Sequence, residues 1–570
     1  MSEAMRGVEL TDETVRDAGA AALAAEHARH YKRPRQRPFT PEDRKRVTIL
    51  YGGLTQRHDR LIGASVRGIG YNVEPLPTPT KADYQTGREY GNNGMCNPTY
   101  FTAGALINYL KRLRDEQGMS VDEIVDKYAF ATAGSRGPCR FGVYSAEYRN
   151  ALRNSGFEGF RAMAFQQTGG LDQTGDDGGL EMTTMFGLAL INAIALADLL
   201  NEVTYHIRPY EAVPGQTDRV MGEAARRVAE TLESRRYDAL VGRPWVRALG
   251  TALPGVDPYK LALLFEQYRS DAFVSALCEC AALIDETVEV DYLRPKPTCK
   301  IIGEFWAQTT EGDGNFNMFP FIESQGGEVL VEPITTWIAY VIAHARDRLI
   351  DERGIPSNDV AAKKRTAWNV LREHVVYGVR RVQLWAVGSL LLREYERYRQ
   401  ALGGTAHAQV DQAELRDLAR RYYHPRCAGG EGHLEVAKTM YYTRNGLAHM
   451  VLSLKPFNCM PSTQSDGAQA AVTAHHPSIL YVPIETSGEG DLSAYSRVQM
   501  ALGEAKVQAR EEFRECVART GRTLDELRRY CAEHRELRRP LQQIRRHPGV
   551  IGRAANFALY VGALMDREQV

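Results

Sequence analysis

The sequence lacks several short motifs that identify common cofactor sites. It has no Gly-x-Gly-x-x-Gly after an expected strand and no Gly-x-x-x-x-Gly-Lys-Ser/Thr, so neither a dinucleotide site nor a phosphate-binding loop is signalled. We therefore expect that ATP does not bind this chain. Its nine cysteines include no Cys-x-x-Cys pair, so the usual local zinc knuckles are also absent.

The sequence also lacks net charge and a long apolar run. Lys+Arg and Asp+Glu are each 71, so no overall field favours nucleic acid or an anionic membrane. The N-terminal sequence MSEAMRGVELTDETV is polar and has no apolar segment typical of a secretion signal. The longest apolar stretch, residues 185–200, is shorter than the ~20 residues that span a bilayer, and it contains Asn192 and Asp198. We expect a buried helix there, and a cytoplasmic protein that binds neither nucleic acid nor a membrane.

What is present is an ordinary globular composition with an odd number of cysteines. With 44% hydrophobic and 25% charged residues, a 570-residue chain corresponds to roughly two to four domains. Nine cysteines without a secretion signal argue against a disulfide framework, because a reducing compartment leaves them as thiols.

The order of apolar segments predicts an α/β protein. Residues 1–46 are interpreted as an N-terminal extension, in which an Ala-rich helical piece leads into a basic, proline-containing linker. An apolar strand at 47–51 follows, and later strand-like segments are separated by helical ones of 10–15 residues, which is typical of a parallel sheet with crossovers. Residues 47–295 are therefore expected to form a Rossmann-like α/β domain with a helical insertion from about residue 180. Residues 296–570 are expected to form a second such domain with a helical C-terminal region.

Three cysteines lie in Gly- and Pro-rich loops beside expected strands or helices. Cys96 lies in GMCNP before a helical segment, Cys139 in TAGSRGPCRFG after a strand, and Cys459 in LKPFNCMPST after another strand. Ligands of parallel sheets bind outside the carboxyl ends of the strands, and a thiolate at a helix N-terminus is stabilised by backbone N–H groups. Three converging thiolates suit three irons of a cubane cluster. Zinc, and cysteines that bind no metal, are the alternatives.

Other loops supply further candidates. Cys427, in HPRCAGGEGH, is placed to be an additional ligand or a neighbour of the site, with Glu431 close by in the sequence. Residues 303–319 contain Glu304 and Glu311 after an expected strand, which indicates either a ligand-facing loop or a helix cap and turn. The segment HIRPYE at 206–211 is either a salt-bridged corner or a charged wall of the site. The remaining cysteines are expected to be structural: Cys278, Cys280, Cys299, Cys516 and Cys531.

Five separated motifs together resemble a known family. They are GMCNPTYFTAGALINYL, AGSRGPCRFGVYSAEYRNALRNSGF, ADLLNEVTYHIRPYEAVPG, GEFWAQTTEGDGNFNMFPFIE and LKPFNCMPST, spread over about residues 46–505. This set resembles the acyl-CoA dehydratase activase-related family, which is linked to 2-hydroxyacyl-CoA dehydratases, benzoyl-CoA reductases and double-cubane cluster proteins. By position, Cys96, Cys139 and Cys459 match the recurrent cysteines of that family. Two departures are the lack of activase domains in this sequence and GNNGM before Cys96, where many relatives have a Lys-Glu pair.

The resemblance implies a Rossmann-like iron–sulfur protein that receives low-potential electrons from a separate ATP-hydrolysing activase of the actin/Hsp70-like fold. The expected function is reduction of a small molecule through a 4Fe-4S cluster, with Glu304, Glu311 and Glu431 as proton carriers and Arg140 and Arg208 as anion clamps. A double cubane needs about six cysteines near the site, so a single cubane or a cluster bridging a homo- or heterodimer is favoured. The alternatives are radical dehydration of a 2-hydroxyacyl-CoA and a non-catalytic electron-relay or scaffold subunit.

Overall fold

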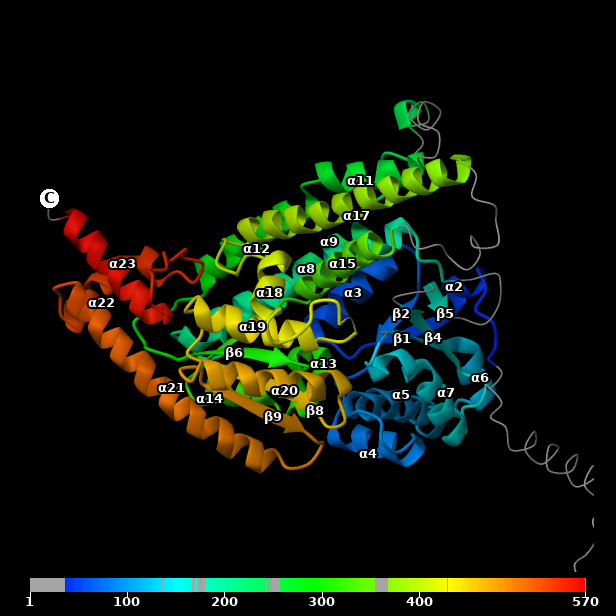
Figure 1. The fold of residues 1–570 in the computed structure, drawn as a ribbon, viewed down its shortest axis with the longest axis horizontal. Helices are drawn as coiled ribbons and strands as arrows, with labels where there is room; N and C mark the ends of the chain where they lie inside the picture. Colours follow the sequence, from blue (N-terminus) through cyan, green and yellow to red (C-terminus); the bar gives the residue numbers. More distant parts are fainter. Residues whose placement is uncertain are drawn as a thin grey trace, which may run out of the picture.

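The computed structural model describes residues 36–135, 137–166, 170–172, 180–241, 243–246, 248, 257–353, 367–427 and 429–568. The Ala-rich helical piece and the start of the basic linker lie outside these residues. The remainder of the linker contains the short helix α2 (Asp43–Arg46) and packs on the first sheet, where Phe39 is 2% exposed and Asp43 accepts a hydrogen bond from Arg161. Figure 1 shows two sheets embedded in a largely helical molecule.

The first sheet has the strand order β2-β1-β3-β4-β5. All neighbours are parallel except β5, which pairs antiparallel with β4 at the edge. The strands are β1 (Thr48–Tyr51), β2 (Val73–Pro75), β3 (Tyr128–Ala133), β4 (Arg161–Gln166) and β5 (Gly170–Asp172). The helices that follow or connect them are α3 (Gln56–Gly68), α4 (Lys81–Tyr90), α5 (Asn97–Asp115), α6 (Val121–Lys127) and α7 (Tyr144–Asn154), with the short η1 (Arg140–Val143) before α7.

The second sheet has the order β7-β6-β8-β9 and is parallel throughout. Its strands are β6 (Thr298–Gly303), β7 (Glu328–Leu330), β8 (Met450–Pro456) and β9 (Tyr481–Thr486). Every residue of β6 and β8 is buried, as expected for central parallel strands that are covered on both faces. The predicted α/β class with two parallel sheets is therefore confirmed.

Both sheets share one topology, in which the first strand along the chain lies between the second and the third. In such a sheet the connections from the first and third strands run to opposite sides, and a crevice forms at the carboxyl ends of these two strands. The crevices therefore lie after β1 and β3 in one sheet and after β6 and β8 in the other. These are the positions at which the candidate site residues follow the strands.

The expected helical insertion is present between the two sheets. It contains α8 (Thr184–Ile207), η2 (Arg208–Tyr210), α9 (Gln216–Ser234), α11 (Pro258–Arg269) and α12 (Ala272–Thr287). Its centre is α8, whose residues from Ala195 to Ile207 are all buried, because the helix packs against α3, α9 and the second sheet. The prediction of a buried helix at 185–200 is thus confirmed.

The second half adds helices around the parallel sheet and at the C-terminal end (Figure 1). They are α13 (Phe305–Thr309), η3 (Gly312–Asn315), α14 (Met318–Ser324), α15 (Ile334–Asp351), α17 (Ala367–Ala401), α18 (Gln412–Ala419), α19 (Gly432–Arg444), α20 (Met460–His475), α21 (Asp491–Arg519), α22 (Leu524–Glu533), η4 (Arg535–Arg538) and α23 (Arg553–Glu568).

Within the part of the chain that the structure describes, two helical stretches are long and apolar enough to cross a membrane by length and composition alone. Thr184–Tyr210 contains the core helix α8 and is 67% buried, whereas Val370–Ala401 in α17 is only 6% buried. Helix α17 lies along one edge of the molecule beside α11 (Figure 1), and it exposes Trp368, Val382 and Trp385 by 60% or more. A single exposed helix of this kind is weak evidence for a membrane, so the expectation of a protein without membrane spans stays a prediction.

The close packing of α4 on α5 positions the Cys96 loop, which joins these two helices. A Cβ atom added at Gly104 of α5 would lie 1.7 Å from the Asp83 carbonyl oxygen of α4. We therefore expect Gly104→Ala to separate the helices and lower the free energy of unfolding by about 1–3 kcal/mol, measured by urea denaturation. Gly222→Ala on α9, where a Cβ has no neighbour within 4 Å, is the control and is expected to stabilise by about 0.5–1 kcal/mol. Equal effects of the two substitutions would contradict this account.

Candidate active site between the two sheets

The three loop cysteines each immediately precede a helix. Cys96 precedes α5, Cys139 precedes η1 after β3, and Cys459 precedes α20 after β8, each with extended backbone at the N-cap position. The Cys96 and Cys459 loops touch, since the Asn97 N–H donates to the Phe457 carbonyl at 3.4 Å and the Asn97 side chain donates to the Thr486 carbonyl at 2.6 Å. Two of these cysteines come from the first half of the chain and one from the second, so the site lies between the two sheets.

The Cys139 loop is held against the other two loops. Arg140 donates a hydrogen bond to the Gly94 carbonyl, which ties it to the Cys96 loop. On the other side, a Cβ added at Gly430 would lie 3.6 Å from Cys139 Cβ and 2.4 Å from a ring carbon of Pro461. Gly430 has φ of 70° and therefore lets the loop before α19 pass between the Cys139 and Cys459 loops.

The three thiols share one electrostatic environment. Burial raises the pKa of each thiol, and the carboxyl of Glu304 is close enough to raise all three further. The pKa of Cys139 is also raised by Glu431. Hydrogen bonds act in the opposite direction: Tyr144 Oη lies 2.8 Å and Thr99 Oγ1 3.6 Å from Cys96 Sγ and lower its pKa. Without a metal the thiols are therefore neutral, and a metal that binds them would replace their protons.

Two glutamates face these thiols. Glu304 follows β6 directly and caps α13, where its carboxylate accepts hydrogen bonds from the amides of Trp306 and Ala307, both at 3.0 Å. Glu431 precedes α19 and accepts from the Phe305 amide at 3.4 Å, so the two carboxyls lie close together. Burial raises the pKa of both carboxyls well above the ordinary range of glutamate, and the charge of Glu304 raises that of Glu431 further. The pair therefore retains a proton near neutral pH.

A cavity of about 320 Å³ adjoins these residues. Its walls are mostly apolar side chains from both halves of the chain, such as Ile49, Phe186 and Trp337. Cys139, Glu304, Glu431, Ser135 and Asp59 are among its polar lining residues. An apolar cavity with a few converging polar groups is the usual form of a small-molecule site.

Sequence reasoning missed two residues of this site. Asp59 lies on α3 after the Gly52-Gly53 turn; burial raises its pKa to about 7, and its Oδ1 has no hydrogen-bond partner in the described part of the chain. Tyr144, at the start of α7, contacts the Cys96 sulfur and also lines the cavity. The glycine pair after β1 was a signal for the Asp59 region, whereas no local signal marks Tyr144.

The spacing of possible metal ligands limits which residues could share a single ion. Among the described residues, one group of three carboxylate, imidazole or thiol side chains has its ligand atoms all within 4.8 Å of one another. It consists of Glu202, His206 and His407. The sulfurs of Cys96, Cys139 and Cys459 do not form such a group, so at least two of them lie more than 4.8 Å apart. A cubane cluster gives each thiolate its own iron and does not require the sulfurs to be so close.

Other predicted residues lie elsewhere. Glu311 accepts a hydrogen bond from the Gln56 amide at 3.0 Å at the start of α3 and does not line the cavity. Cys427 is exposed on the loop that leads to Gly430. Arg208 forms ion pairs with Glu323 and Asp218, as expected if the HIRPYE segment is a salt-bridged corner. The cysteines expected to be structural are buried in strands or helices, except Cys278, which is exposed.

No protein-family model matches this chain, and no curated protein matches it significantly.

Proposed function

We propose that this chain is a Rossmann-like iron–sulfur oxidoreductase, which accepts low-potential electrons from a separate ATP-hydrolysing activase and uses them to reduce a small molecule. The observation that carries the proposal is the meeting of three helix-capping cysteines and two buried carboxyls beside one apolar cavity, where two parallel sheets face each other. The shared 2-1-3-4 strand order of both sheets is that of the flavodoxin-like doubly wound fold, and it supports the Rossmann-like assignment only in the broad sense of a parallel sheet with a ligand crevice at its switch point. The activase, of the actin/Hsp70-like fold, is implied by the resemblance of the five motifs.

In this proposal Cys96, Cys139 and Cys459 hold a 4Fe-4S cluster. A bound cluster would supply one-electron transfer at a potential set by burial and by hydrogen bonds to sulfur. Among the described residues, the groups that can donate such hydrogen bonds include the hydroxyls of Tyr144, Thr99 and Ser462 and the backbone amides of Phe141 and Ser462. Glu304 and Glu431 hold a proton within the site, so the chain can deliver protons as well as electrons to a bound molecule.

The apolar walls define the class of substrate, a small and largely uncharged molecule or an acyl group. They also favour a second candidate function, the radical dehydration of a 2-hydroxyacyl-CoA, because an acyl chain fits an apolar cavity. Net reduction consumes electrons in proportion to product, whereas radical dehydration needs only catalytic amounts, so electron stoichiometry distinguishes the two. An electron-relay subunit would not need a cavity beside its cluster.

The proposal is tested by iron and acid-labile sulfide analysis, with Mössbauer spectra, of the full chain purified without oxygen. The expected result is about four iron and four sulfide per chain. About eight iron would replace the single cubane by a double cubane and keep the reductase assignment. Absence of iron, with zinc or no metal in its place, would overturn the proposal.

The proton held by the Glu304–Glu431 pair gives a prediction that does not depend on a substrate. We expect infrared spectra of the protein to contain the C=O band of a buried carboxylic acid at neutral pH, because burial raises the pKa of both groups. The band should weaken as the pH rises, since a carboxyl with a raised pKa loses its proton only at higher pH. Glu304→Gln removes the charge that raises the pKa of Glu431, so the remaining acid should ionise at a lower pH.

The matched control for this prediction is Glu485→Gln. Glu485 is an exposed carboxylate at the end of β9, and its removal should leave the buried band unchanged. Persistence of the full band in the double variant Glu304→Gln/Glu431→Gln would show that another group holds the proton. Asp59 is then the group to test, because burial raises its pKa as well.

A further inference from the structure

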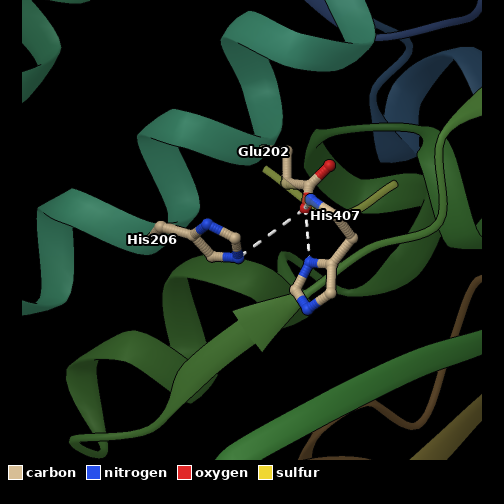
Figure 2. A group of neighbouring side chains, drawn as sticks. All are labelled: Glu202, His206 and His407. Carbon is tan, nitrogen blue, oxygen red and sulfur yellow. Dashed lines mark hydrogen bonds and ion pairs between the residues drawn. The ribbon is translucent and has the colours of Figure 1, made fainter. Parts of the chain in front are cut away.

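A second group of ionisable side chains lies apart from the cysteines, where α8 meets the loop between α17 and α18. Glu202 and His206 are one turn apart on α8 and therefore project from the same face of the helix. His407 reaches them from the loop, and Figure 2 shows the two imidazoles on either side of the Glu202 carboxylate. Glu202 Oε1 lies 2.6 Å from His407 Nδ1 and 3.8 Å from His206 Nε2.

This group has buried polar atoms that nothing in the described structure satisfies. His206 is 2% exposed, yet neither of its ring nitrogens has a hydrogen-bond partner, and the same is true of Glu202 Oε2. A second carboxylate is near, since Glu328 Oε1 of β7 lies 4.0 Å from His206 Nε2. Buried polar groups are normally paired, so a buried imidazole with two unpaired nitrogens between two carboxylates points to a missing ligand.

We propose that Glu202, His206 and His407 bind a divalent transition-metal ion of the Zn²⁺ type, with Glu328 as a fourth group within reach. Their ligand atoms all lie within 4.8 Å of one another, so small side-chain movements bring them onto one ion. Two imidazoles with one or two carboxylates form a common donor set for zinc and related ions. Magnesium and calcium prefer sites made of oxygen atoms and are disfavoured here.

The position of Arg546 determines which nitrogen of His407 is free to bind the metal. Its Nη2 lies 3.0 Å from His407 Nε2, so that nitrogen accepts a hydrogen bond and the ring proton is on Nδ1, where it faces Glu202. A metal on Nδ1 takes the place of this proton, which moves to Nε2, and Arg546 must then turn away. The arginine side chain borders an open cavity of about 420 Å³ and has room to do so.

The same cavity indicates what completes the coordination. His407, Arg546 and Arg553 line it together with Glu328 and Asn556. The carboxylates of Glu202 and Glu328 balance the guanidiniums of Arg546 and Arg553, so a bound dication leaves excess positive charge. The coordination position that faces the cavity therefore suits an anionic oxygen ligand, such as a carboxylate, rather than a neutral one.

The test is a titration of the chelator-treated full chain with Co²⁺, in which binding is measured by the visible d–d absorption of the bound ion. Zn²⁺ is then added to displace the bound Co²⁺. Wild-type protein should bind one Co²⁺ without the thiolate charge-transfer bands that cysteine ligation produces. His206→Gln should weaken this binding more than ~100-fold, because it removes a direct ligand. His449→Gln, which changes another buried histidine beside a carboxylate, Glu512, should leave it unchanged.

Arg546→Met keeps the proposal falsifiable if His206→Gln does not fold. It removes an exposed side chain that opposes metal binding, so Co²⁺ should bind about 10-fold more tightly than to wild type. This factor is typical of the effect of one neighbouring group on metal affinity. The proposal is overturned if wild-type protein binds no Co²⁺ free of thiolate bands, or if Arg546→Met binds no more tightly than wild type. It is also overturned if a folded His206→Gln variant binds as well as wild type.

Discussion

Replacing Cys139 by alanine is expected to reduce the iron content of anaerobically purified protein from about four per chain to near zero, because one of three cysteine ligands is lost. The fold should remain, since Cys139 is only half-buried and lies in a loop rather than in a strand or the interior of a helix. Iron and sulfide analysis measures the first effect, and far-ultraviolet circular dichroism checks the second. Cys96→Ala and Cys459→Ala should behave in the same way.

The matched control is Cys516→Ala, which removes a buried thiol of α21 that does not line the cavity. Its iron content should equal that of wild type. Full iron content in folded Cys139→Ala protein would exclude Cys139 as a ligand, and loss of iron from both variants would indicate a general effect of destabilisation.

The largest expected effect on stability comes from the buried ion pair of the second sheet. Lys300 of β6 is fully buried, its Nζ lies 2.6 Å from Glu332 Oε2, and it sits 4.0 Å from the centre of the Tyr442 ring. Replacing Glu332 by leucine leaves the ammonium uncompensated in the core and should lower the free energy of unfolding by about 3–5 kcal/mol. Urea denaturation of the variant and wild type measures the difference.

The double variant Lys300→Met/Glu332→Leu distinguishes the effect of an unpaired charge from the effect of losing the ion pair itself. Because the uncompensated Lys300 charge is gone, it should recover part of the stability lost in Glu332→Leu, while the buried Lys438, which Glu332 also faces, keeps Glu431 and Glu435 as its nearby carboxylates. A double variant as unstable as the single one would show that packing, and not charge, controls this site.

The same pair also makes stability depend on pH. Burial alone would raise the pKa of Glu332, but Lys300 and Lys438 hold it at about 2. A carboxyl with a lowered pKa contributes stability above its ordinary pKa of about 4.3, and this contribution is lost as the pH falls toward 2. The Glu332→Leu variant should therefore lose less stability on acidification than wild type does.

Sequence patterns predicted site residues that come shortly after the end of a strand. Glu304 follows β6, Cys139 and Cys459 follow β3 and β8, and parallel topology brings such positions to one edge of each sheet. The buried helix α8 was also predictable, because its residues from Met185 to Leu200 are apolar except for Asn192 and Asp198.

Residues that reach a site by helix packing could not be predicted in this way. Asp59 and Tyr144 belong to helices whose sequence pattern reports which face is buried, but not which neighbour that face meets. Likewise, His407 joins Glu202 and His206 only because a loop distant in sequence packs on α8. The sequence likewise contains no clear local pattern that predicts the antiparallel strand β5 or the exposed apolar face of α17.

The separation of the three cysteines along the chain has a consequence for biosynthesis. Cys96 and Cys139 belong to the first sheet's loops, whereas Cys459 follows the third strand of the second sheet and is made only after both other cysteines and the whole first sheet. A cluster held by all three cannot be completed before Cys459 has been made and the second sheet has closed on the first. Cluster insertion would thus be a late step that follows docking of the two halves, and a bound cluster would then cross-link them.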